Sequence, residues 1–364
     1  MAQTRLVSAD SHVAETEDVF REIDPRYRSA RPRAAFDEKL GAVLCVPELE
    51  HTIPMGLICT GGRPPEDFAR AVRWEELHPA GHDPRARLAI QESEGVSAEV
   101  LYPSVGMVLC GHPDADYKKA CFDAYNRWLA GFCETAPERL IGIPVATCRS
   151  VVEGIGELES LAAQGFRGVM LPGDPVLEDY DARCWDPLWE ACCALELPVS
   201  FHIVTTRRDF EPRTRGPKLA GQVAAFRGVQ DILLMLVLGG VFERHPALRV
   251  VCVEAEAGWV PHLSQRMDHS WRRHRHWAES AALAHPPSHY VDANLYFTFQ
   301  DDRSLRWVSE GLNWGHLLWA SDFPHSDGTY PHTAAVVAEL TAGMSDARSR
   351  AILSENVEQL YHLA

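Results

Sequence analysis

The sequence predicts an α/β fold, a single (β/α)8 barrel of the TIM type, and three observations lead to this prediction. Eight short apolar runs, most of them rich in β-branched residues, recur along the 364 residues. Segments with helical periodicity connect the runs, and such alternation is typical of a closed parallel barrel. No GxGxxG or GxxxxGK[ST] motif follows any run, which weakens the alternative of an open, doubly wound nucleotide-binding sheet.

The eight runs are short and apolar, as buried strands of a parallel sheet are. In order they are RLVSADSHV (5–13), AEVLYPSV (98–105), LIGIPVAT (140–147), GVMLPGD (168–174), PVSFHIVT (198–205), LRVVCVEAE (248–256), LYFTFQ (295–300) and LLWASDFPH (317–325).

The connecting segments carry helix signals. Apolar residues within 114–133 form one stripe at helical spacing. The next helix is expected to begin with the capping-box pair Ser150 and Glu153 and to end at Gly165. Another is expected to begin at Asp186-Pro187, a capping residue followed by proline. These helices complete the strand–helix alternation of a barrel.

The segment 14–97 breaks this rhythm because it is long and rich in Pro, Gly and Arg. Long insertions after barrel strands commonly cover the catalytic face, so we expect a lid or substrate-specificity region here. We find no internal repeat, and we expect residues 1–364 to form one elaborated domain. The element DPRARL, with Asp83, Arg85 and Arg87, is expected to support this loop through ion pairs.

Composition narrows the class of protein. The formal charge of −16 argues against a nucleic-acid surface, which needs clustered Lys and Arg. No signal pattern or membrane-spanning run is recognised, and ten scattered cysteines fit a reducing compartment, so we expect a cytoplasmic protein without membrane contact. One basic stretch, WRRHRHW (271–277), runs against the trend. A solvated helix face explains it better than a phosphate contact.

Polar residues gather where the expected strands end, which is where barrel enzymes place their chemistry. Side chains two apart on a strand share a face, so such pairs project together. Imidazole and carboxylate groups are ligands for Zn²⁺, Fe²⁺ or Mn²⁺, and a cation would offset the cost of gathering buried carboxylates. The candidate ligands at these ends are Asp10 and His12, His202, Glu254 and Glu256, and Asp322 with His325 as a further candidate.

These strand ends resemble the amidohydrolase-related family, whose members include metal-dependent decarboxylases and hydrolases of the aminocarboxymuconate-semialdehyde decarboxylase type. The resemblance rests on four stretches and covers most of the chain, least so in 14–79. The stretches are DSH at 10–12, FHIV at 201–204, GGVFERHPALRVVCVEAEAGWVP at 239–261 and ASDFPHSDGTYP at 320–331. It implies a metal-dependent enzyme with a small-molecule substrate and, as is common in the family, a homodimer.

Two departures from the family pattern concern the reaction. Asp10 stands where members carry the first His of His-x-His, and Glu254-Ala-Glu256 stands where a catalytic His-Gly-Gly is expected. The variant resembles a divergent branch of non-heme diiron monooxygenases. That resemblance implies two iron ions, O₂, an external electron donor and hydroxylation of a bulky aliphatic substrate of secondary metabolism. Such substrates are often coenzyme-A thioesters, diterpenoid ones among them, whose phosphates Arg207-Arg208 or 271–277 would contact.

The alternative keeps the common family chemistry. One Zn²⁺ or Mn²⁺ would serve a hydrolase or decarboxylase, with Glu254 or Glu256 as the general base. In the oxygenase interpretation Glu254 is a ligand and Glu256 supports it. A binding barrel with a decayed site ranks last, because every exchanged residue retains a group able to bind metal.

Overall fold

The structure is a computed structural model that describes residues 5–49, 52–68, 70–207 and 216–363. Within these residues, eight strands correspond to the eight predicted runs. They are β1 (Leu6–Val13), β5 (Val96–Pro103), β6 (Leu140–Gly142), β7 (Val169–Met170), β8 (Val199–His202), β9 (Val250–Val253), β10 (Leu295–Phe299) and β11 (Leu317–Trp319). Most strands end earlier than the runs, because Glu254 and Asp322 belong to the loops that follow, whereas Asp10, His12 and His202 still lie on strands.

All neighbouring strands of the barrel run parallel, in the order β1-β5-β6 and β7-β8-β9-β10-β11. A parallel bridge between Val145 and Met170 joins β6 to β7. The first and last strands meet through backbone hydrogen bonds: Asp322 N–H donates to the Asp10 oxygen at 3.0 Å, and His12 N–H to the Phe323 oxygen at 2.8 Å. The predicted closed barrel is therefore confirmed, and its seam lies beside Asp10, His12 and Asp322.

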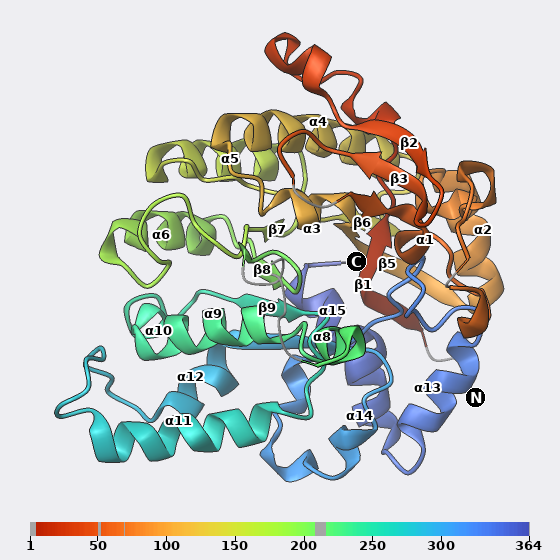
Figure 1. The fold of residues 1–364 in the computed structure, drawn as a ribbon. Helices are drawn as coiled ribbons and strands as arrows, with labels where there is room; N and C mark the ends of the chain where they lie inside the picture. Colours follow the sequence, from red (N-terminus) through yellow and green to blue (C-terminus); the bar gives the residue numbers. More distant parts are fainter. Residues whose placement is uncertain (1–4, 50–51, 69, 208–215, 364) are drawn as a thin grey trace.

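Helices surround the strands (Figure 1). The helices of at least eight residues are α2 (Pro84–Glu94), α4 (Ala115–Glu134), α5 (Val151–Ala163), α6 (Asp186–Ala194), α9 (Arg227–Leu238), α11 (Val260–His274), α12 (Pro287–Asn294) and α13 (Thr333–Thr341). The shorter ones are α1 (Met55–Ile58), α3 (Val105–Leu109), α8 (Lys218–Val223), α10 (Val241–Arg244), α14 (Asp346–Arg350) and α15 (Asn356–Leu360). Ser150 caps α5 as predicted, but the Glu153 side chain binds Arg149 instead of completing the capping box.

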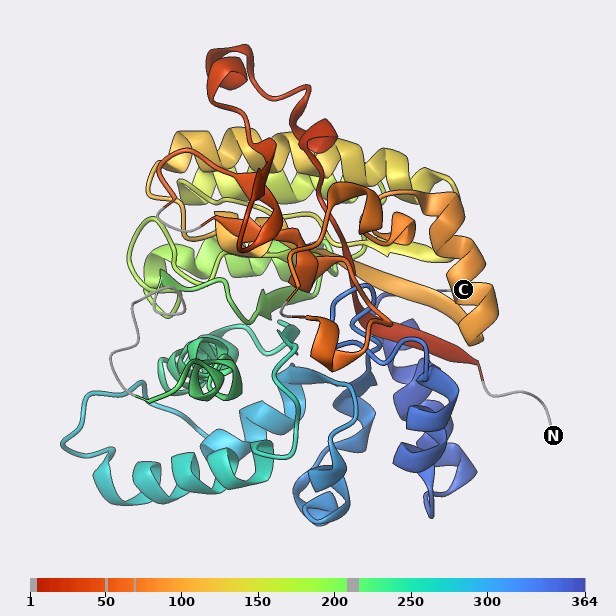
Figure 2. The ribbon, with the colours of Figure 1, turned by 45° about the vertical axis from the view of Figure 1, so that its right-hand side comes forward.

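The insertion after β1 contains a small antiparallel sheet of β2 (Arg33–Asp37), β3 (Gly41–Cys45) and β4 (Ile53–Pro54). In Figure 2 the segment before β2 projects from the barrel above α4, and the sheet lies below that segment. The insertion is tied to the segment after β11, since Gly61 N–H donates to the Pro324 oxygen and Ser326 N–H to the Leu57 oxygen. The last part of the segment expected to be a lid is α2, the helix that connects β1 to β5.

The buried side chain of Arg87, on α2, connects the strands that meet at the seam of the barrel. It is fully buried, and its Nε and Nη2 donate to the Glu99 carboxylate of β5 at 2.6 and 3.0 Å. Its Nη1 donates to the His12 oxygen at 2.7 Å and its Nη2 to the Phe323 oxygen at 2.9 Å. Of the ion pairs expected in DPRARL, the one at Arg87 is present, and Arg87 joins β5 to β1 and to the segment after β11.

One stretch, Lys218–Leu238, is long and apolar enough to cross a membrane by length and composition alone. It is divided into α8 and α9. The inner face of α9, with Val229, Ile232 and Leu236, packs into the hydrophobic core. These contacts are those of a barrel helix.

Candidate metal centre

The predicted ligands come from four segments that meet at one end of the barrel. Asp10 and His12 lie on β1, where an irregular register between Ser8 and Ser11 interrupts the pairing with β5. His202 is the last residue of β8, and Glu254 follows β9 directly. Bulges beside active sites re-aim side chains, and the one in β1 lies at Asp10.

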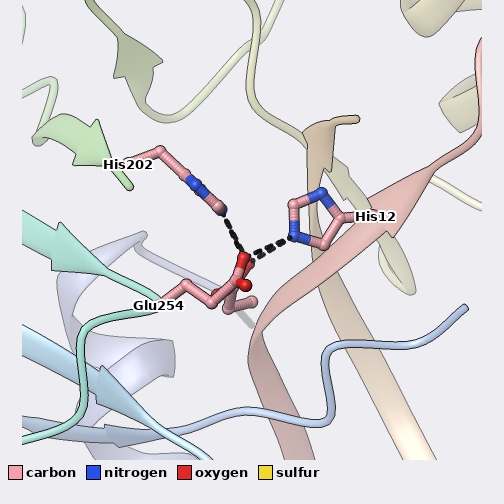
Figure 3. A group of neighbouring side chains, drawn as sticks. His12, His202 and Glu254 are labelled. Atoms are coloured by element: carbon pink, nitrogen blue, oxygen red, sulfur yellow. Dashed lines mark ion pairs between the residues drawn. The ribbon is translucent and has the colours of Figure 1, made fainter. Parts of the chain in front are cut away.

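The side-chain atoms of these residues lie close together. His12 Nε2 is 3.3 Å from Asp10 Oδ1, 3.5 Å from Glu254 Oε2 and 3.3 Å from Asp322 Oδ1. His202 Nε2 is 3.3 Å from Glu254 Oε2 (Figure 3) and 3.7 Å from Asp10 Oδ1. One atom from each of Asp10, His12, His202 and Glu254 falls within 4.8 Å of the others. The structure thus brings together the residues that the sequence singled out.

The facing atoms lack hydrogen-bond partners, although they are buried. Among the described residues, both oxygens of Asp10 and Asp322, Glu254 Oε2, and Nε2 of His12 and His202 are in this state. Each imidazole uses its other nitrogen: His12 Nδ1 donates to the Pro103 oxygen at 3.1 Å and His202 Nδ1 to the Ile203 oxygen at 3.0 Å. Both Nε2 atoms therefore direct a lone pair at the carboxylates, an arrangement typical of metal ligands.

The protonation behaviour of the group is that of buried carboxylates that need a positive charge beside them. Burial opposes charge on His12, but the neighbouring carboxylates of Asp10, Glu254 and Asp322 favour its protonated form and raise its pKa. Burial likewise opposes ionisation of Asp10, yet the His12 and His202 imidazoles lower its pKa. Burial raises the pKa of Asp322 to about 8. Without a metal, protons must supply the positive charge that these carboxylates require.

His325 lies at the edge of the group. Its ring stacks on that of His12, with centroids 3.8 Å apart, and its Nδ1 is 2.9 Å from Asp322 Oδ1. Ser104 donates its only hydroxyl proton to the Val13 oxygen, so it accepts from His325 Nε2 at 2.9 Å. His325 belongs to a second group of four with His12, Glu254 and Asp322. Since both groups share His12, whose Nε2 carries one lone pair, they do not form two independent four-ligand sites.

Three acidic residues at this end have left-handed backbone conformations, with φ of 57° for Glu254, 57° for Glu256 and 55° for Asp322. Such conformations are costly for residues other than glycine and persist where surrounding structure enforces them. At Glu254 the enforcement includes a backbone N–H bond to Thr298 Oγ1 at 2.8 Å. Glu256 is part-buried, and burial together with Asp302 and Asp301 raises its pKa to about 8.

Some contributors to the centre were not predicted from the sequence. Tyr102 is fully buried, and its ring lies 5.4 Å from that of His202 and 6.3 Å from that of His12. Ser104, which holds His325, follows β5 by one residue. Their positions at a strand end were the only available signal, because Tyr and Ser are common in loops and cores.

Comparison with known proteins identifies the family. A family model described as Amidohydrolase matches residues 76–363. The chain belongs to the amidohydrolase family. An amidohydrolase from Mycobacterium avium subsp. paratuberculosis K-10 is similar in structure, with a TM-score of 0.82, 20% identity and coverage of 99% of this chain and 98% of the other.

Two decarboxylases share the amidohydrolase fold with this chain. The 5-carboxyvanillate decarboxylase LigW from Sphingomonas paucimobilis has a TM-score of 0.71 and 19% identity, with 100% of both chains covered. A dihydroxybenzoic acid decarboxylase from Polaromonas sp. JS666, solved with bound manganese and 2-nitroresorcinol, has a TM-score of 0.66 and 17% identity over 99% of this chain and 98% of the other. Both the TIM-barrel prediction and the family resemblance are confirmed.

The prediction of a diiron monooxygenase is wrong. The matching amidohydrolases and decarboxylases contradict an oxidoreductase, and the bound manganese contradicts two irons. The physical reason is that mixed carboxylate and imidazole ligands suit manganese as well as iron, so ligand type could not select iron. The shared His12 also leaves the two ligand groups overlapping. The expected O₂, electron donor and hydroxylation lose their basis with the diiron assignment.

The basic stretch 271–277 lies away from the centre. It begins near the C-terminal end of α11, which starts six residues after Glu254 and spans 15 residues, or about 22 Å. In Figure 1 this end of α11 lies at the far left, away from β2 and β3. A coenzyme contact by this stretch at the metal centre is therefore disfavoured. Arg208, the other expected phosphate contact, lies outside the described residues, whereas Arg207 is exposed.

Proposed function

We propose that this chain is a decarboxylase that uses one divalent metal ion, Mn²⁺ or Zn²⁺, and acts on a small aromatic carboxylic acid. The observation that carries the proposal is the set of facing, unpartnered atoms on Asp10, His12, His202, Glu254 and Asp322. Oxygen and imidazole ligands in this mixture suit either ion. Similarity in fold to manganese-containing decarboxylases supports the reaction class.

In this proposal the ligands differ in how they face solvent. The side chains of Asp10, His12, His202 and Asp322 are at most 1% exposed, whereas that of Glu254 is 20% exposed. The substrate therefore approaches from the side of Glu254. When bound, the ion would hold the substrate carboxylate and stabilise negative charge that develops on the ring side as CO₂ leaves.

Replacing the carboxylate by hydrogen requires delivery of one proton to the substrate carbon that loses CO₂. Glu256 is the proposed acid–base group because it lies two residues beyond Glu254, and its Oε2 is buried without a hydrogen-bond partner. A carboxyl group in such a place can pass a proton to a bound molecule. Its left-handed backbone conformation, like that of Glu254, fits a residue held for function rather than for stability.

Hydrolysis is the second candidate, because the structure with a TM-score of 0.82 is an amidohydrolase. The same ligands would serve, and Glu256 would accept a proton from water instead of donating one. The two reactions are separated by their products, CO₂ in one case and a new carboxylic acid in the other.

The experiment starts from protein stripped with a chelator and reloaded separately with Mn²⁺, Zn²⁺ or Fe²⁺. We expect about one ion per chain by elemental analysis and CO₂ release from some members of a panel of hydroxylated benzoic acids. Glu254→Gln should weaken metal binding at least tenfold, and Glu159→Gln, an exposed change on α5, should not. Activity that needs no metal, or metal content unaffected by Glu254→Gln, would contradict the proposal.

A further inference from the structure

Lys118 is a buried cation whose donors are mostly unused. It lies in the first turns of α4 and is only 3% exposed. Its Nζ donates one hydrogen bond to a described residue, to the Cys110 oxygen at 3.1 Å, and forms no ion pair within the described part of the chain. An ammonium group has three N–H donors, so two of them lack a described acceptor. Burying such a group is costly unless an anion accompanies it.

A purely structural role accounts for only part of this arrangement. Cys110 ends α3, and a lysine that donates to the last carbonyl of a helix stabilises it. That contact satisfies one N–H and leaves the charge without a partner. The Cys110 thiol does not supply the anion, because burial raises its pKa to about 12.

The charges around Lys118 leave room for an added anion. Burial lowers the pKa of Lys118, and Arg207 adds to this effect, while Asp174 opposes it. Asp174 already accepts a hydrogen bond from the Arg207 backbone N–H. The guanidinium of Arg207 makes no hydrogen bond or ion pair that the described residues account for, and Lys118 lies within electrostatic range of this second cation and of the Asp174 carboxylate. Counted over the residues that the structure describes, these three groups carry a net positive charge, in a chain of charge −16.

This cluster lies at the end of the barrel that holds the candidate metal centre. Ser104, beside His325, precedes α3, and Cys110 is six residues further on, about 9 Å at helical rise. Asp174 and Arg207 follow β7 and β8, and α3 lies near these loops in Figure 1. The opposite side, after β9 to β11, is acidic, because Glu256 is surrounded by Asp301, Asp302 and Asp327.

We propose that Lys118 binds a second anionic group of the substrate, so that the substrate class is an aromatic acid with two negatively charged groups. The inference rests on the proposed function, in which the metal centre holds the first carboxylate. Lys118 would pair with the second, and Arg207 would strengthen the attraction from the solvent side. The acidic side after β9 would repel the opposite orientation, so the charges also fix the direction of binding.

The test is a binding measurement that does not depend on turnover. Calorimetry on the Mn²⁺-loaded protein compares isophthalate and terephthalate, which have two carboxylates, with benzoate, which has one. We expect at least one dicarboxylate to bind tenfold or more tightly than benzoate. Lys118→Met, which keeps the aliphatic stem, should remove this advantage and leave benzoate binding unchanged. Lys119→Met is the matched control on the same helix, since Lys119 pairs with Asp123 and Glu157.

The outcomes separate this inference from the proposed function. Equal affinity of the wild-type protein for benzoate and both dicarboxylates would overturn the role of Lys118, even if Lys118→Met fails to fold. An equal loss for all ligands in a folded Lys118→Met protein would do the same. Preferential dicarboxylate binding that depends on Lys118, in a protein that releases no CO₂, would retain the anion site and refute decarboxylation alone.

Discussion

Replacing Arg87 with methionine tests how strongly the barrel seam depends on one buried guanidinium group. Arg87 donates to Glu99 and to the backbone oxygens of His12 and Phe323, and its guanidinium lies 4.8 Å from the centre of the Phe323 ring. Methionine keeps an unbranched apolar chain but removes the charge and every donor. The change therefore isolates the electrostatic part of the contact.

The expected loss of stability in Arg87→Met depends on Glu99, which stays buried without its cation. Removing one member of a buried ion pair typically costs about 3–5 kcal/mol, because the other charge is left uncompensated. Gln91 and Ser11 still donate to Glu99 after the change, so we expect the lower end, about 3 kcal/mol. Urea unfolding measures this free energy. Arg85→Met, an exposed change on α2, should stay within about 0.5 kcal/mol of the wild-type protein.

A double substitution decides whether the reasoning holds. Arg87→Met with Glu99→Leu removes both charges, and apolar replacement of a whole buried pair is often close to neutral. The double variant should therefore be more stable than Arg87→Met alone. A single variant within about 1 kcal/mol of wild type, or a double variant less stable than the single one, would refute the argument.

Three further predictions concern the metal, the insertion and acid stability. Chelation should lower the melting temperature and Mn²⁺ should restore it. A ligand at 100 times its Kd adds about 2.7 kcal/mol to the free energy of unfolding. Scanning calorimetry should show no such response to Mn²⁺ in His202→Ala. Gly41→Ala should destabilise the β2–β4 sheet by about 1–3 kcal/mol and speed its proteolysis, because φ is +79° and a Cβ would lie 2.3 Å from Val72 N. Gly165→Ala, with φ of +92° and no atom within 4 Å, should cost only about 1 kcal/mol. His245 and Arg244 hold the pKa of Asp186 below its usual value against the effect of burial. The stabilisation by ionised Asp186 is complete above the pKa that this group has in the unfolded chain, and it is lost as the pH falls through its lower pKa in the folded protein. Asp186→Asn lacks this titration. It should therefore lose less stability than the wild-type protein between pH 5 and pH 3 in urea titrations.

Much of the fold was readable from the sequence because its signals are local. Each apolar run is short enough to be a strand, and the polar residues that close the runs mark the barrel end where the chemistry lies. Asp10, His12, His202 and Glu254 could be singled out for that reason. Their proximity follows from barrel closure, which brings the carboxyl ends of parallel strands together.

What could not be predicted depends on contacts between distant segments. The irregular register in β1 and the bonds from Arg87 to His12 and Phe323 leave no local pattern. The capping box at Ser150 was only half formed because Arg149 competes for Glu153, a contact that spacing alone does not reveal. Metal identity also escaped prediction, since carboxylates and imidazoles suit several ions.

The seam between the first and last strands has a consequence for the order of folding and metal binding. Asp10 and His12 belong to the first strand, whereas Asp322 follows the last, and backbone bonds join the two. The nearby pair Ser8 and Ser321 is separated by 313 positions in the chain. A nascent chain therefore cannot assemble the full ligand set until Asp322 has left the ribosome, more than 300 residues after Asp10. Ion uptake would then mark the closure of the barrel, and a metal-responsive signal would report directly on the joining of β1 to the segment after β11.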